Sequence, residues 1–219
     1  MALSMEKVNH ENLGDKVYRL IKDKILEREV GPGQRLRISE LAQALEVSPS
    51  LVRNALTLLA KDGLVEFFRR GIHVRRISRK EMQDLYELRR LLEVFALQKG
   101  LSIMTDEDIA AIKRQYEEAV EERLSGGVQG CYRLDITLHQ LLVDSSQNSH
   151  LIKMFSTCQA LMSLVILSDF DRTHNVDQSL EEHGEIIETL LNRDLAKAIQ
   201  ALNTHLDKAE KRVLDLFPE

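Results

Sequence analysis

The residues of this chain best suited to chemistry are one aspartate and three histidines in its C-terminal half. Asp135 and His139 are four positions apart, which places them on one face of a helix, about one turn apart. His183 and His205 follow in two later segments, EEHGEII and LNTHLDKA. One carboxylate and three imidazoles that meet inside a helical bundle would bind a divalent metal, with coordination positions left open for a ligand. Zinc is the first expectation, with nickel or manganese as alternatives.

Spacing alone leaves other interpretations of these four residues open. Separate histidines in helices are often surface residues or hydrogen-bonded core residues. Three-histidine sites with an open position also occur in enzymes that hydrolyse or oxygenate their substrates, and a metal can be purely structural. The sequence contains no Glu-x-x-His pair of the di-iron kind and no obvious general base beside the four residues. We therefore expect a binding protein and not an enzyme.

The segments that carry these residues have the pattern of helices throughout. Ser78 and Glu81 form a capping-box signature that opens a helix to about residue 103. A second helix starts at Thr105 and ends before Gly126-Gly127, where two glycines interrupt the pattern. Further helices are expected at about 129–145, 148–169, 179–192 and 194–216. Six helices joined by short loops predict an antiparallel bundle.

The N-terminal part has a different layout, three helices and a short hairpin. Apolar residues from Val17 to Leu26 recur at helical spacing, up to a Gly-Pro-Gly turn at 31–33. A second helix is expected from Ser39, as its N-cap, to about Leu45, and a third from Ser48-Pro49 to about Asp62-Gly63. Two β-rich runs, 64–68 and 72–77, then form a hairpin. This order predicts a winged helix-turn-helix in a mainly α chain.

A helix-turn-helix presents the first turns of its second helix to base edges in the major groove of DNA. Here that helix begins at Ser48, and the hairpin lies where it would reach adjacent phosphates or the minor groove. Arg37 precedes the second helix and is suited to a backbone contact. The expected DNA-binding residues are Ser48, Ser50, Leu51, Arg53 and Asn54 on the helix, Arg69, Arg70 and His73 on the hairpin, and Arg37.

Charge is distributed unevenly along the chain. The net charge is −5, but residues 1–77 carry 14 basic against 10 acidic side chains, and residues 78–219 carry 16 against 25. A basic DNA-binding part joined to an acidic partner domain would show this asymmetry. We expect a tail at 1–14, a DNA-binding domain at 15–77 and an effector-binding domain at 78–219.

The remaining sequence features indicate a cytoplasmic location. Cys131 and Cys158 have neither metal-type spacing nor a partner framework, which suits a reducing compartment. The N-terminal segment lacks the apolar core of a signal peptide. No apolar run is expected to reach the roughly 18–20 residues that span a bilayer, so no membrane partner is expected.

Residues 15–76 resemble the DNA-binding domain of the GntR family, and they include the segment VYRLIKDKILEREVGPGQRLRISELAQALEVSPSLVRNALTLLAKDGLVEFFRRGIHV. The shared features are "GPGQRL", "ELA", "VS", "VR-AL-LL", "GLV" and a wing that contains a glycine. The resemblance implies DNA contacts at Ser50, Arg53 and the wing glycine, Gly71. Pro49 and Asn54 depart from the family pattern.

Residues 80–214 resemble the FCD ligand-binding domain of the FadR subfamily, closest to its six-helix, VanR-type branch. The shared motifs are "ELRRLLE", the Asp135–His139 pair with Asn148 downstream, "EEH" and "AIQALNTHL". The resemblance implies metal ligation by Asp135, His139, His183 and His205. It also implies that Arg89 grips a carboxylate effector, where the alternative is an ion pair with Glu93. Asn148 either orients the effector or caps the following helix.

Together these features predict a homodimeric DNA-binding transcriptional repressor. Each protomer would bind one half of a short inverted repeat in double-stranded DNA. A small carboxylate metabolite bound at the metal site would control the affinity for that operator.

Overall fold

A computed structural model describes the backbone of residues 13–170 and 173–217, and the side chains of 13–166 and 175–217. The chain divides between Arg76 and Ile77 into two compact units, each with its own core. Most of the N-terminal tail expected at 1–14 lies outside the described residues.

The first unit is built on three helices: α1 (Leu13–Leu26), α2 (Ile38–Ala44) and α3 (Pro49–Lys61). Helix α1 buries the face that carries Val17, Ile21 and Ile25, and it packs against α3. Helix α3 contributes Val52, Ala55, Leu56 and Leu59 to the same core. The Ser48 hydroxyl accepts a hydrogen bond from the Leu51 amide and caps α3, with Pro49 at its first position. The polar face of α3 is therefore left at the surface.

A three-stranded antiparallel sheet completes this unit, in the order β1-β3-β2. Strand β2 (Val65–Phe68) and strand β3 (Gly71–Val74) form the expected hairpin, with Phe68 paired to Gly71 across a turn at 69–70. Strand β1 (Arg35–Leu36) was not expected, because two residues are too few to show an alternating pattern. Helix α2 was also expected to start after Ser39; it begins at Ile38, with Arg37 as an N-cap without a side-chain hydrogen bond.

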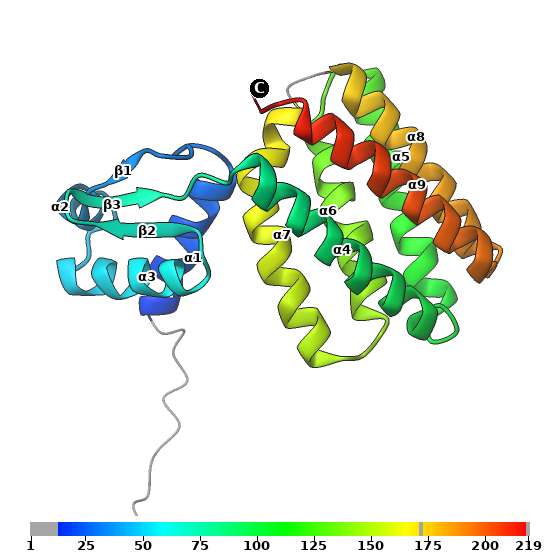
Figure 1. The fold of residues 1–219 in the computed structure, drawn as a ribbon, viewed down its shortest axis with the longest axis horizontal. Coiled ribbons are helices and arrows are strands. Elements are labelled where there is room, and N and C mark those ends of the chain that lie inside the picture. The colour runs from blue at the N-terminus through cyan, green and yellow to red at the C-terminus, as the bar shows by residue number, and fades with distance from the viewer. Residues whose placement is uncertain (1–12, 171–172, 218–219) are drawn as a thin grey trace, which may run out of the picture. The chain divides into compact units, whose positions relative to one another are not determined.

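The described residues of the second unit form six helices, as the sequence predicts: α4 (Arg79–Gly100), α5 (Asp106–Leu124), α6 (Gln129–Asp144), α7 (Ser149–Phe170), α8 (Thr173–Leu191) and α9 (Leu195–Leu214). Figure 1 shows how they are arranged. Side chains of Ser78, Thr105 and Asp194 cap α4, α5 and α9. Helix α8 begins six residues before its expected start at 179; several residues of the N-cap type precede Ser179 in the sequence, among them Thr173, Asn175 and Asp177, so residue types alone do not single out the boundary.

The helices of the second unit enclose a core that is not uniformly apolar. Helix α4 packs against α6, α7 and α9, while α8 packs against α5 and α9. Leucines and isoleucines fill most of the space between them. Charged and imidazole side chains are nevertheless buried there, on α4, α6, α8 and α9: Arg89, Glu93, Asp135, His139, Glu182, His183, His205 and Arg212. Burying ionisable groups is costly unless they are paired or bind an ion, so this set marks a site.

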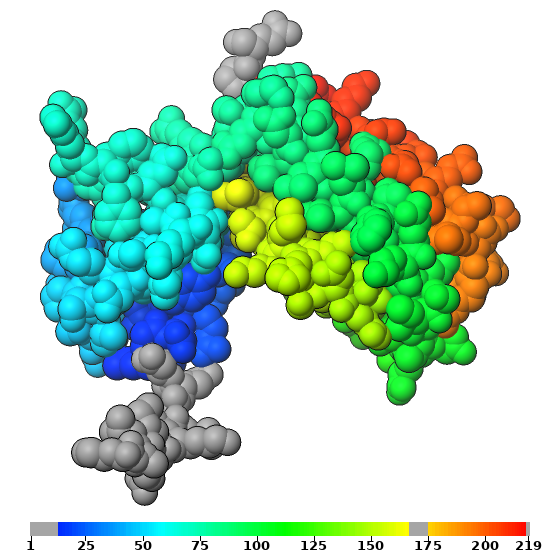
Figure 2. Space-filling view, turned by 60° about the horizontal axis from the view of Figure 1, so that its bottom comes forward, coloured from blue at the N-terminus to red at the C-terminus, as the bar shows by residue number. Residues whose placement is uncertain are grey.

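Helix α7 corrects one sequence expectation. Its segment Ser149–Ile166 is long and apolar enough to cross a membrane by length and composition, with a mean hydropathy of 1.2. Figure 2 shows α7, in yellow-green, at the surface of the unit beside α4. Its other side buries Leu151, Phe155, Cys158 and Met162 in the bundle. The apolar composition is accounted for by packing in this unit.

Candidate metal centre and DNA-binding surface

Three helices bring the four residues singled out in the sequence to one point. Asp135 and His139 lie on α6, His183 on α8 and His205 on α9. One donor atom from each lies within 4.8 Å of the other three. The three imidazoles are 0–1% exposed, whereas the Asp135 side chain is 12% exposed. The cluster is therefore closed on the side of the histidines and nearest to solvent at the carboxylate.

The separations between donor atoms fit a divalent metal. His139 Nε2 lies 3.2 Å from His205 Nε2, and Asp135 Oδ1 lies 3.4 Å from His183 Nε2 and 3.7 Å from His139 Nε2. Two ligand atoms about 2.1 Å from zinc, at tetrahedral or octahedral angles, are about 3.0–3.4 Å apart. Three nitrogens and one oxygen are also a donor set that zinc accepts. The residues present fit the ion.

Two of the histidines contact carboxylates through Nδ1, on the side of the ring that faces away from the cluster. His139 Nδ1 lies 2.6 Å from Glu93 Oε2, and Arg89 Nε donates to Glu93 Oε1 at 2.6 Å. His205 Nδ1 lies 2.9 Å from Glu182 Oε2, and Arg212 donates to both oxygens of Glu182, at 2.8 and 2.9 Å. In each case the Nε2 side of the ring faces the cluster.

The charges of these groups suit a cation at the centre. Burial opposes ionisation of Asp135, yet its contacts with His183, His139 and Arg89 hold its pKa well below the usual range. Burial lowers the pKa of His183, and burial with the neighbouring imidazoles lowers that of His205 to about 3. At neutral pH the site therefore offers the carboxylate of Asp135 and the uncharged imidazoles of His183 and His205, which are the forms that bind metals.

His183 gives an independent indication that the cluster is incomplete without an ion. Its buried Nε2 has no hydrogen-bond partner within the part of the chain that the structure describes. The nearest carboxylate oxygen, on Asp135, is 3.4 Å away, and the His183 ring lies tilted against that of His205. An unpartnered buried polar atom costs about 1–3 kcal/mol, which a metal–nitrogen bond would remove.

The two residues expected to bind an effector have different surroundings. Arg89 is buried on α4 and pairs with Glu93, so the ion pair considered as its alternative role is present. Desolvation of Arg89 is outweighed by Glu93 and Asp135, which keep its pKa above the usual range. Asn148 lies just before α7, and its Oδ1 accepts from the amides of His150 and Leu151. The structure thus places Arg89 next to the metal cluster and Asn148 at a helix terminus.

Asn148→Ala tests the capping role. Loss of the two hydrogen bonds to the first turn of α7 should destabilise the second unit by about 0.5–2 kcal/mol. Urea denaturation followed by circular dichroism measures this, and Asn148→Ser should restore most of the loss because serine also caps helices. An unchanged unfolding midpoint for Asn148→Ala would contradict the assignment.

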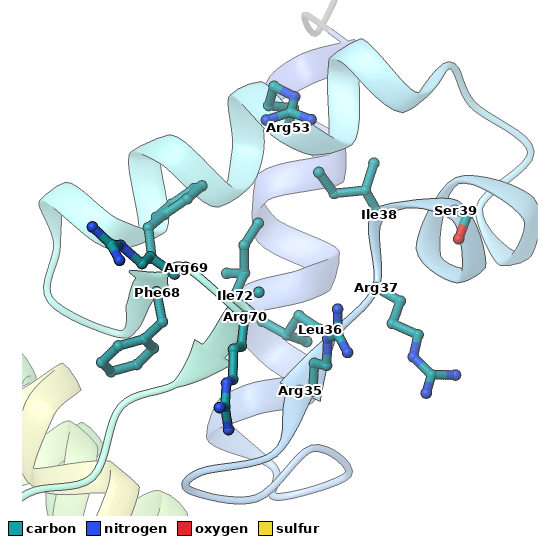
Figure 3. Close-up of a pocket in the computed structure, with 12 residues that line it drawn as sticks. Arg35, Leu36, Arg37, Ile38, Ser39, Arg53, Phe68, Arg69, Arg70 and Ile72 are labelled. Carbon is teal, nitrogen blue, oxygen red and sulfur yellow. The ribbon is translucent and has the colours of Figure 1, made fainter.

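In the first unit, a pocket with a volume of about 820 Å³ lies between α2, α3 and the sheet (Figure 3). Its lining forms a basic concave surface. Five of the predicted DNA-binding residues line it: Arg37, Arg53, Arg69, Arg70 and Gly71. Arg37 also pairs with Glu40 at 2.6 Å. Ser48, Ser50 and Asn54 are exposed on the first turns of α3, where the Ser48 and Ser50 hydroxyls are 3.0 Å apart.

The surroundings of this surface include residues that the sequence did and did not single out. His73, also predicted to bind DNA, is half-buried on β3, where its Nδ1 is buried and its ring contacts that of Phe68 edge-on. Arg35 on β1 was missed; its guanidinium lies over Gly71, where a Cβ would come within 2.6 Å of its Nε. Phe67 and Phe68 are about half exposed on the same surface. The only signal for Arg35 was its basic charge, because strand β1 could not be predicted.

Comparison with known proteins supports the division of the chain into these two parts. Residues 13–74 match the family "Bacterial regulatory proteins, gntR family", and residues 84–208 match the FCD domain. The chain belongs to the GntR family of regulators with an FCD domain. It is 28% identical to the HTH-type transcriptional regulator YdhC of Bacillus subtilis, over 87% of this chain and 86% of that protein. It is 23% identical to the HTH-type transcriptional repressor RspR of Escherichia coli, over 94% and 91%.

Solved structures agree on the fold. A GntR protein from Rhodococcus sp. RHA1 superposes with a TM-score of 0.84 at 24% identity, over 94% of this chain and 99% of that one. The Zn²⁺-bound FCD domain of TM0439 superposes with a TM-score of 0.55 at 25% identity, over 64% of this chain and 96% of that domain. The family and the relatives identify the chain as a transcriptional regulator and not an enzyme. An FCD domain similar to its own binds zinc.

Proposed function

We propose that this protein is a homodimeric transcriptional repressor of the cytoplasm, whose affinity for an inverted-repeat operator is set by a small carboxylate at a zinc site. The observation that carries the proposal is the convergence of Asp135, His139, His183 and His205 inside the FCD domain. The zinc-bound FCD domain of TM0439 supports zinc as the metal. The relative RspR, by name a repressor, supports the direction of regulation.

A count of buried charges favours an anionic effector. Arg89 balances Glu93, and Arg212 balances Glu182. Asp135 and three neutral imidazoles then leave a divalent cation with one uncompensated positive charge. A buried net charge is unfavourable, and a carboxylate oxygen is a suitable further ligand for zinc. A carboxylate metabolite would satisfy both requirements.

The exposure of Asp135 and the position of Arg89 indicate where such an effector would bind. Asp135 is the ligand nearest to solvent, so the carboxylate side is the side of approach. Arg89 contributes to the electrostatic environment of Asp135, and its Nε–H is already taken by Glu93. An arginine carries five N–H donors in a planar fork. The remaining N–H donors of Arg89 are suited to the oxygen of the effector's carboxylate that does not bind zinc, or to a second carboxylate of the effector.

Helix α4 supplies a path from this site to the DNA-binding unit. It carries Arg89 and Glu93 and begins three residues after the last residue of the first unit. At its start, Arg79 donates to the Leu214 carbonyl at 2.5 Å, at the end of the helix that carries His205. An effector that stabilises one arrangement of α4 and α9 would therefore shift the conformations available to the short segment that joins α4 to the DNA-binding unit.

DNA binding would use the basic surface of the first unit. Arg53 and Asn54 on α3 would contact base edges or phosphates in the major groove, with Arg37 on the backbone. Arg69, Arg70 and Gly71 at the hairpin turn would lie against the neighbouring groove. The Ser48 and Ser50 hydroxyls would donate to phosphate oxygens near the start of α3.

The test is a titration of the zinc-loaded full chain with aliphatic mono- and dicarboxylates that bind free zinc weakly. Fluorescence anisotropy follows binding to a duplex selected from random DNA, and thermal unfolding follows the same samples. We expect one carboxylate to change operator affinity at least about tenfold, which corresponds to about 1.4 kcal/mol of coupling, and to raise the melting temperature. A zinc-loaded protein whose operator affinity no carboxylate alters would overturn effector control and leave a structural metal.

A further inference from the structure

We propose that Glu93 and Glu182 are positioning residues of the metal centre: each holds a ligand histidine by Nδ1 so that its Nε2 lone pair points at the metal. This inference rests on the metal binding proposed above and adds two carboxylates and their two arginines to the site. The carboxylates lie on α4 and α8 and the arginines on α4 and α9, so the residues that would set metal affinity extend beyond the four donors.

The direction of the two hydrogen bonds follows from the state of the carboxylates. Arg89 Nε donates to Glu93 at 2.6 Å, and Arg212 donates to both oxygens of Glu182 at 2.8 and 2.9 Å, so each carboxylate is paired with a permanent cation as an anion. An ionised carboxylate only accepts hydrogen bonds. The hydrogen on His139 and on His205 must therefore sit on Nδ1, which donates to Glu93 and Glu182.

With both hydrogens on Nδ1, the two Nε2 atoms present lone pairs to each other at a separation of 3.2 Å. Two facing lone pairs repel unless a cation lies between them. The positioning carboxylates thus create the arrangement that a metal relieves. A carboxylate behind a ligand histidine also makes the imidazole a stronger donor, and its loss typically weakens metal binding about 10–100-fold.

Each carboxylate is itself held by an arginine, which limits its freedom to turn. Arg89 takes one oxygen of Glu93 and His139 takes the other, and both partners of that pair are at most 5% exposed. Arg212 grips Glu182 with two nitrogens, and its side chain is 10% exposed. Two-pronged arginine–carboxylate contacts fix the orientation of the carboxylate as well as pairing its charge. A carboxylate with a fixed orientation in turn orients the histidine ring that it contacts.

Removal of one charge tests the role. Glu182→Gln and Glu93→Gln keep the size of each side chain but remove its negative charge. In the full chain, competition with a chromophoric chelator should show zinc bound about 10–100-fold more weakly in both variants. Glu185→Gln and Glu87→Gln, on exposed positions of the same two helices, are the matched controls and should bind zinc like the wild type.

A merely structural role for these ion pairs predicts a different result. In that case Glu93→Gln and Glu182→Gln would make the metal-free protein less stable, but the folded variants would bind zinc within about twofold of the wild-type affinity. That outcome would overturn the inference. Should either glutamine variant fail to fold, Arg212→Lys keeps a cation behind Glu182 and loses the two-pronged contact. We expect it to fold and to weaken zinc binding by less than Glu182→Gln weakens it.

Nuclear magnetic resonance of the wild type gives a readout that needs no variant. Two-bond ¹H–¹⁵N correlations of the zinc-loaded full chain should show Nδ1-protonated rings with zinc on Nε2 for His139 and His205. A proton on Nε2 of either ring would contradict the proposal. If the wild type binds no zinc at all, the proposed function fails instead, which keeps the two failures distinguishable.

Discussion

Replacement of His183 by alanine is expected to weaken zinc binding by about 100-fold or more, at least as much as the largest effects of outer carboxylates. His183 offers one of the four candidate donor atoms, and its Nε2 lacks a hydrogen-bond partner among the described residues. Zinc at 1,000 times the dissociation constant should stabilise the wild type by about 4.1 kcal/mol, and a 100-fold weaker site keeps only about 1.4 kcal/mol. The zinc-induced rise in melting temperature should fall accordingly, from about 8–16 °C to about 3–6 °C.

The comparison of metal-free with zinc-loaded protein separates this effect from loss of packing. His183→Ala empties a buried position but also removes an unsatisfied nitrogen, so the metal-free protein should lose only about 1–2 kcal/mol. His150→Ala, at an exposed position on α7, is the control and should keep the full zinc response. An equal zinc-induced shift in His183→Ala and in wild type would remove His183 from the site.

Arg53→Ala is expected to produce the largest loss of operator binding among single substitutions in the first unit. Arg53 is exposed on the second turn of α3 and lies on the same concave surface as Arg69 and Arg70. A base or phosphate contact by arginine contributes about 1–3 kcal/mol. The proposed dimer would lose the contact in both half-sites, so operator affinity should fall by about 30-fold or more.

Anisotropy titrations at several salt concentrations measure this loss and its origin. A phosphate contact shows as a shallower dependence of log affinity on log salt, whereas a guanine contact shows as relaxed specificity at one base pair. Lys61→Ala, on the last turn of the same helix, removes an equal charge outside that concave surface and should change affinity little. Equal losses in the two variants would show that α3 acts only through its overall charge.

The sequence was sufficient to predict the helices of both units and the β2–β3 hairpin, but not strand β1, and it singled out the four candidate ligands. The periodicity of α1 and α3 and the Ser48-Pro49 start gave the helix-turn-helix, because a capped amphipathic helix is specified locally. The four candidate ligands could be singled out because two of them share one helix face and all four match the FCD pattern. Their convergence itself depends on the packing of α6, α8 and α9, which no spacing along the chain determines.

The partners behind the ligands could not be predicted for the same reason. Glu93 was visible only as an i,i+4 partner of Arg89 on one helix, yet its second oxygen binds His139, 46 residues away. Glu182 is next to His183 in sequence but binds the other histidine, His205. Arg35 escaped notice because strand β1 is two residues long. Contacts between segments that are distant in the sequence could be identified only from the three-dimensional structure.

The most direct test of the metal centre is zinc K-edge X-ray absorption of the full chain, loaded with one equivalent of zinc. We expect three imidazole nitrogens and at least one oxygen at about 2.0–2.2 Å from the zinc, with no sulfur neighbour. Zinc bound through a cysteine sulfur at about 2.3 Å, or fewer than three imidazoles around it, would contradict the centre formed by Asp135, His139, His183 and His205.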